Sequence, residues 1–189
     1  YGMKDWLLGF EYRRRSDSWL NAVVLEYIYS KYQSGPIYHD HTKTIADHIG
    51  GNDDYYNHYI YPGYQHWGQA MSNPLYRSPI YNKDGRIAFT NNRFVAYHLG
   101  LSGTPNQYVN WRMLASWQKG LGTYTEPYSK ERSNMSLLAE ITYKPHSISA
   151  SWLNGVDIKA AYGMDFGSIL GGINYGFQLT ITKTGVFNF

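Results

Sequence analysis

Histidine and acidic side chains gather in one stretch of the chain, residues 33–86. This stretch holds five of the seven histidines. His39, Asp40 and His41 place two imidazoles and a carboxylate in immediate succession, and both groups are ligands for zinc and related ions. Their spacing matches no strong zinc signature, so the alternative is the packing of a polar loop. These three residues are therefore the candidates for a metal site.

The same side chains could also carry acid–base chemistry, because His and Asp form proton-transfer pairs. A nucleophile is not evident, since Ser34, Ser72 and Ser78 lie in no nucleophile-elbow motif. The chain has no cysteine, which excludes a disulfide framework and a thiolate metal site. We therefore expect no catalytic residues, no enzyme activity and no cofactor.

Aromatic residues in this stretch suggest a third chemistry, contact with carbohydrate. Tyr and Trp rings stack on the weakly apolar faces of sugars, while Asn, Asp and His bond sugar hydroxyls. The candidate contacts are Tyr55, Tyr56, His58, His66 and Trp67. The alternative is that these aromatic residues pack together as a cap. The composition permits a glycan surface without establishing one.

The elements that must position these side chains are strands, as the end of the chain shows best. Within residues 173–189, odd positions are mostly apolar and even positions mostly polar, and the chain ends on Phe189. Strands of soluble proteins average about 5–6 residues, whereas a strand tilted across a bilayer needs roughly 9–11. A long alternating strand with an aromatic terminus is typical of an outer-membrane β-barrel. It predicts a periplasmic C-terminus that the barrel assembly machinery recognises through Phe189.

Similar alternation predicts six earlier strands. Their expected ranges are 2–13, 19–32, 87–102, 108–119, 134–144 and 148–162. The residues expected on the polar faces, and hence lining a lumen, are Glu26, Arg112, Glu140, Asp157 and Lys159. Lys183 and Asn154 are exceptions that fall on apolar faces.

The predicted connections alternate in length. Those at 14–18, 103–107 and 145–147 are short, and those at 33–86, 120–133 and 163–171 are long. Short periplasmic turns and long extracellular loops alternate in this way in outer-membrane barrels. Counting back from a periplasmic C-terminus places every long connection outside the cell, including the 33–86 loop.

Seven strands with two unpaired edges cannot close a barrel, and open edges are not tolerated in lipid. We therefore expect residues 1–189 to be the C-terminal portion of one transmembrane antiparallel β-barrel domain. The start of the chain has no signal peptide, so we expect a longer protein or a mature fragment. A soluble β-sandwich is the alternative, because alternation alone does not separate the two.

Composition agrees with this fold class. Aromatic residues make up 17% of the chain, and twenty of them are tyrosines, as expected of interfacial girdles and exposed loops. No run of about 18 apolar residues exists, so a helical span is excluded. The formal charge is +3 and mostly scattered, so nucleic acid is not an expected partner.

A series of short motifs then identifies a family. They lie at 35–40, 53–57, 66–68, 73–75, 78–85, 91–93 and 98–100. In order and spacing the chain resembles the C-terminal part of the Wzi-type capsule assembly proteins, in their Bacteroides-like form. The resemblance implies a plugged outer-membrane barrel, of about 18 strands in the enterobacterial branch. It also implies a lectin-like role in holding capsular or surface polysaccharide.

The leading expectation is therefore a non-enzymatic outer-membrane barrel that assembles or anchors surface polysaccharide. Its expected partners are that polysaccharide, outer-membrane lipid and other outer-membrane proteins. The alternatives are a porin or transport channel, a scaffold subunit of an outer-membrane complex, and a hydrolase that uses His39 and Asp40.

Overall fold

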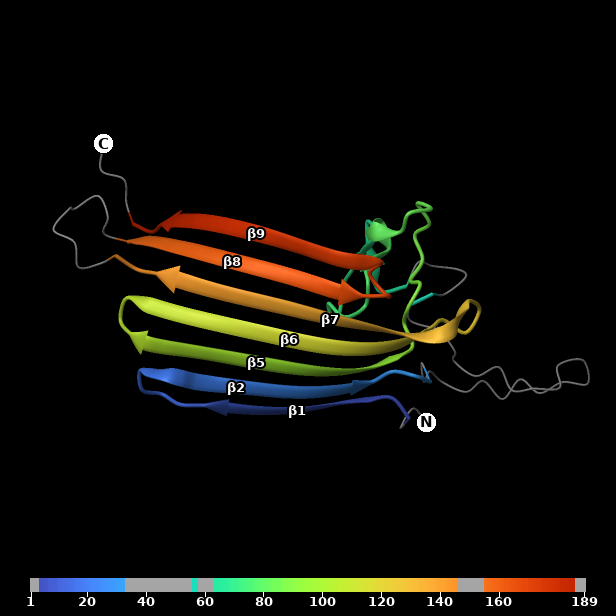
Figure 1. The fold of residues 1–189 in the computed structure, drawn as a ribbon, viewed down its shortest axis with the longest axis horizontal. Coiled ribbons are helices and arrows are strands. Elements are labelled where there is room, and N and C mark those ends of the chain that lie inside the picture. Colours follow the sequence, from blue (N-terminus) through green and yellow to red (C-terminus); the bar gives the residue numbers. More distant parts are fainter. Residues whose placement is uncertain (1–3, 33–55, 58–62, 146–154, 186–189) are drawn as a thin grey trace, which may run out of the picture.

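The computed structural model describes residues 4–32, 56–57, 63–145 and 155–185. An antiparallel sheet of seven strands dominates this part of the chain, and its strands follow chain order across the sheet (Figure 1). They are β1 (Trp6–Arg13), β2 (Ser18–Tyr29), β5 (Phe94–Asn106), β6 (Val109–Gly122), β7 (Pro127–Tyr143), β8 (Val156–Gly167) and β9 (Gly172–Lys183). The predicted all-β, antiparallel fold class is confirmed. The sheet is open, with β1 and β9 at its edges.

One face of the sheet is apolar across its whole width. Directly paired residues of neighbouring strands point to the same face, so the register defines each face. One such row runs through Leu8, Tyr27, Tyr97, Trp117, Met135, Phe166 and Ile173. Many large side chains on this face are exposed, reaching 77% for Tyr175. The described residues therefore leave this apolar face uncovered.

The opposite face is polar and partly covered. Its central row runs through Glu26, His98, Ser116, Ser136, Asp165 and Asn174. The connection between β2 and β5 folds over one end of this face. Its described part contains a hairpin of β3 (Gln65–His66) and β4 (Gln69–Ala70), followed by the short 3-10 helix η1 (Pro79–Tyr81).

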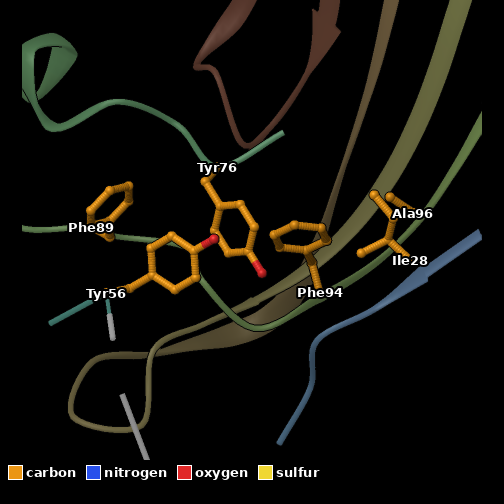
Figure 2. Packing of buried hydrophobic residues seen from close by; sticks show 6 residues of the cluster. All are labelled: Ile28, Tyr56, Tyr76, Phe89, Phe94 and Ala96. Carbon is orange, nitrogen blue, oxygen red and sulfur yellow. The ribbon is translucent and has the colours of Figure 1, made fainter. Parts of the chain in front are cut away.

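The hydrophobic core lies between this connection and the polar face (Figure 2). Its members are Ile28, Tyr56, Tyr76, Phe89, Phe94 and Ala96. The rings of Tyr56 and Tyr76 stack with their centroids 3.9 Å apart, and Phe94 meets Tyr76 edge-on at 4.7 Å. Burial thus takes place on the polar side of the sheet, because three apolar residues of β2 and β5 interrupt that face where the connection covers it.

The two ends of the sheet differ. The β1–β2 and β5–β6 turns lie at one end, where β9 also finishes, and the β2–β5, β6–β7 and β8–β9 connections lie at the other (Figure 1). The long β2–β5 connection lies at the predicted end. The predicted alternation of lengths is wrong for the β6–β7 and β8–β9 connections, which are as short as the β1–β2 turn.

The predicted bounds of four strands were wrong. Most of the expected 120–133 loop is strand, because β6 and β7 continue as a hairpin to Gly122 and from Pro127. β8 likewise runs to Gly167, inside the expected 163–171 loop. β5 begins at Phe94 instead of residue 87, because residues just before it enter the core, where Phe89 is buried. Asn154 lies outside the described residues.

A close approach at Gly120 fixes the segment that leads into β5. Asn91 lies over this glycine, and a Cβ there would come within 2.4 Å of the Asn91 Oδ1 atom. The same oxygen accepts a hydrogen bond from the backbone N–H of Gly122 at 3.1 Å. Glycine at 120 therefore lets the connection lie directly on the end of β6.

We predict that Phe94→Ala destabilises the protein strongly. Phe94 is 0% exposed and joins the sheet to the core cluster, and emptying such a site costs about 3–5 kcal/mol. Guanidinium unfolding of the purified full-length protein measures the change. Tyr81→Ala is the control, since Tyr81 is 69% exposed. Equal losses in the two variants would contradict a core between the connection and the sheet.

Candidate functional site

The β3–β4 hairpin presents one tryptophan in an unusual backbone conformation. Trp67 and Gly68 form its turn with φ angles of 50° and 77°, the signs expected for a type I′ turn. Asn, Asp and Gly favour such positions, and other residues lose energy there. The side chain of Trp67 is 83% exposed, so burial does not offset this cost.

The turn that carries Trp67 is fixed from several sides. The Gly68 N–H donates to Gln65 Oε1 at 2.6 Å, and the Gly68 carbonyl accepts from the Ile80 N–H at 2.8 Å. The N–H of Ala70 donates to Ser78 Oγ at 3.0 Å. These bonds attach the hairpin to η1 and hold Trp67 outward in one place. The exposed His66 ring lies edge-on to it, with centroids 6.1 Å apart.

The structure separates the other predicted sugar contacts. Tyr56 is only 4% exposed, and its hydroxyl shares a hydrogen bond with Ser72 Oγ at 2.7 Å. Its ring belongs to the core and offers no surface to a ligand. For Tyr56 the alternative that the aromatic residues pack together therefore holds. Tyr55 and His58 lie outside the described residues. His66 and Trp67 are thus the predicted contacts that are placed on the surface.

The metal candidates His39, Asp40 and His41 also lie outside the described residues. In the part of the chain that the structure describes, no group of three or more His, Cys, Asp or Glu side chains could hold a metal ion.

The five residues predicted to line a lumen share the polar face. The register places Glu26, Arg112, Glu140, Asp157 and Lys159 on the same side of the sheet. Glu140 lies between two cations, with Oε2 at 3.2 Å from Arg112 Nη2 and Oε1 at 3.6 Å from Lys159 Nζ. Its side chain is 15% exposed, and the carboxylate offsets the charges of Arg112 on β6 and Lys159 on β8.

A second polar group, not recognised from the sequence, lies nearer the covered end. Glu26, His98 and Ser116 are directly paired on β2, β5 and β6. The Nδ1 atom of His98 and the Ser116 hydroxyl are 2.7 Å apart and hydrogen-bonded. Such residue types also build nucleophilic triads, but among the described residues no hydrogen bond joins Glu26 to His98. Each residue alternates correctly in the sequence, yet only the register brings the three together.

The described residues 56–57 and 63–93 of the connection between β2 and β5 are called the covering segment below. An arginine connects this segment to the β6–β7 hairpin. The guanidinium of Arg86 bonds both carboxylate oxygens of Glu126, at 2.8 and 3.0 Å, and Asp84 Oδ2 at 2.7 Å. Hydrogen bonds from its guanidinium hold the pKa of Glu126 below the ordinary 4.5. The backbone N–H of Arg86, followed by its guanidinium, lowers the pKa of Asp84 below 3.8.

Comparison with known proteins gives this site no precedent: no protein-family model, curated protein or solved structure matches the chain. Within the described ranges, no helix is long and apolar enough to span a membrane.

We predict that Arg86→Ala loosens the covering segment in a pH-dependent way. Carboxylates with lowered pKa values stabilise the folded state at pH values above their ordinary pKa. This stabilisation is lost as the pH falls through the lowered pKa. The variant should therefore be less stable than wild type at pH 7 and equally stable well below pH 3.8, the ordinary pKa of Asp84.

Unfolding midpoints measured across this pH range give the comparison, with Lys83→Ala as a neighbouring exposed control. A difference that persists unchanged at low pH would mean that Arg86 acts through packing of its aliphatic part and not through its ion pairs.

Proposed function

We propose that this chain is the later part of an outer-membrane β-barrel that holds surface polysaccharide at its outer mouth, without enzymatic activity. The observation that carries the proposal is the exposed apolar face of the whole seven-stranded sheet. Soluble monomers rarely expose apolar patches of this extent. Lipid is the environment that such a face requires, with the polar face turned to the interior of the barrel.

The aromatic residues on the apolar face support this placement. On β6, Trp117 and Trp111 are 117 − 111 = 6 residues apart, roughly 20 Å along a strand, close to the apolar band of about 25 Å in such barrels. Near Trp117 the rings form a row across four strands, with centroid distances of 5.1 Å for Trp6–Tyr27, 5.0 Å for Tyr27–Tyr97 and 5.9 Å for Tyr97–Trp117. Such a row suits a membrane interface.

The proposed orientation puts the end with the short turns in the periplasm and the covered end outside the cell. Phe189, the residue proposed to engage the barrel assembly machinery, lies outside the described residues. The free edges of β1 and β9 need strands beyond those of the described residues, because unpaired backbone groups are costly in lipid. Further strands of a longer protein, as the resemblance to Wzi-type proteins implies, would complete the wall of the barrel.

The covering segment favours an anchor over an open channel. It reaches from β2, where Ser30 Oγ donates to the Asn92 carbonyl at 3.1 Å, to the β8–β9 turn, where Arg77 Nη1 donates to the Ile169 carbonyl at 3.5 Å. Between them Gln118 Nε2 on β6 donates to the Leu75 carbonyl at 3.0 Å. A segment fixed across the mouth obstructs solute flow and supplies a surface on which a polymer can be held.

Trp67 is the proposed main contact with the polymer. A tryptophan ring stacks on a sugar ring and keeps an N–H for its hydroxyls. The hairpin already fixes the backbone that carries this ring, so little backbone ordering is needed on binding. The resemblance to capsule assembly proteins points to capsular or related surface polysaccharide as that polymer.

We predict that Trp67→Asn weakens polysaccharide binding without harming the fold. Asn-Gly is the preferred sequence of a type I′ turn, so the variant should be at least as stable as wild type. Loss of a central aromatic anchor costs about 2 kcal/mol or more, which is roughly thirtyfold in affinity. Cells that express the full-length variant should shed polysaccharide into the medium, as measured by glycan assays of cells and supernatant.

Trp19→Asn is the matched control, because Trp19 is 75% exposed and lies at the opposite end of the sheet. This variant should retain polysaccharide. Normal retention by Trp67→Asn at normal surface expression would contradict the contact. Large, steady conductance of the full-length protein in planar bilayers would contradict the anchor and favour the channel.

A further inference from the structure

A cavity lies between the covering segment and the polar face of the sheet. Its volume is about 240 Å³, and β2, β5, β6 and β7 form its floor. Asn73, Pro74 and Leu75 form its remaining wall. This wall is fixed, because Gln118 donates to the Leu75 carbonyl and the Leu75 N–H donates to Asn73 Oδ1 at 2.9 Å. The cavity is therefore bounded by hydrogen-bonded residues at the end of the sheet that the covering segment overlies.

The floor presents several hydrogen-bonding groups in one row. Glu26, His98, Ser116 and Ser136 are paired across the four strands and all line the cavity. His98 and Ser116 are hydrogen-bonded to each other. Ser136 Oγ accepts a bond from the buried Asn134 side chain at 3.3 Å, which leaves its hydroxyl hydrogen available for another acceptor. Among the described residues, no basic side chain forms an ion pair with Glu26.

Apolar side chains complete the lining. Leu114 and Leu138 occupy the next row of the same face, and Pro74 and Leu75 lie on the wall. Leu114 lies close to the strand beside it, since a Cβ at Gly100 would be 3.3 Å from its Cδ2 atom. The cavity thus combines donors and acceptors on its floor with aliphatic surfaces around them. That combination fits a small ring that carries hydroxyl groups at its rim and C–H groups on its faces.

We infer that this cavity binds one neutral or amino-bearing sugar ring and rejects sugar acids. The inference rests on the proposed function and assigns a second contact to the same polymer, inside the mouth and away from Trp67. Sites for drug-sized ligands measure about 300–1,000 Å³, so the smaller cavity fits a single ring. The carboxylate of Glu26 accepts from hydroxyl or ammonium groups and repels the carboxylate of a uronic acid.

The test uses the full-length protein in detergent, titrated separately with glucose, glucosamine and glucuronic acid and followed by saturation-transfer NMR. Glucose and glucosamine should bind, and glucuronic acid should bind at least about tenfold more weakly because of charge repulsion. Glu26→Gln should remove this discrimination. Absence of binding by all three sugars, or unchanged discrimination in Glu26→Gln, would overturn the inference.

A cavity-filling variant locates the site. Ser136→Leu should abolish glucose binding, whereas Ser102→Leu, on the same face and outside the cavity lining, should leave it unchanged. Equal binding by these two variants would overturn the assignment, and the Glu26→Gln titration remains decisive if Ser136→Leu does not fold. Retention of polysaccharide that depends on Trp67 while Ser136→Leu binds glucose normally would leave the proposed function standing and refute only the cavity.

Discussion

Strand pairing is the constraint on which the rest of this structure depends. In a fully paired antiparallel sheet, opposite residues must share a face, so each residue of one strand decides the surroundings of its partners in the next. The register from β1 to β9 collects most large apolar side chains on one side and most charged ones on the other. The exceptions on the apolar face, Lys119, Glu131 and Lys183, lie towards the ends of the strands. A slip of one residue at any pair would exchange the two faces of every strand beyond it.

Because the apolar face is uncovered in the described part of the chain, the buried packing that stabilises the fold lies on the polar side. There the covering segment brings its own rings, Tyr56, Tyr76 and Phe89, to the few apolar residues that β2 and β5 offer. On this side Glu140 is matched by Arg112 and Lys159, whereas Glu26 has no ion-pair partner among the described residues. The same segment therefore closes the core, crosses one end of the polar face and projects the hairpin that carries Trp67.

The sequence predicted the strands well because alternation is a local property. The prediction failed at residues 127–133, which extend β7. These residues are mostly polar on both faces, and all but Tyr128 are exposed, so no pattern marks them as strand. It also failed where long-range packing decides. Tyr56 reads like the other tyrosines of the connection, such as the exposed Tyr64, and only its stacking on Tyr76 places it in the core. Trp67-Gly68 is no usual turn signal, and the meeting of His98 with Ser116 follows from register alone.

The long β6–β7 hairpin has one more consequence. Met135 pairs with Trp117 in the aromatic row, and β7 begins at Pro127, so the hairpin continues for 135 − 127 = 8 residues, up to roughly 26 Å. In the proposed orientation, with this row at the lipid boundary, the hairpin tip at 123–126 projects away from the membrane, and Arg86 tethers it to the covering segment. Among the described residues this tip extends farthest at that end of the sheet (Figure 1), so in the proposed orientation antibodies or phages at the cell surface would reach it first.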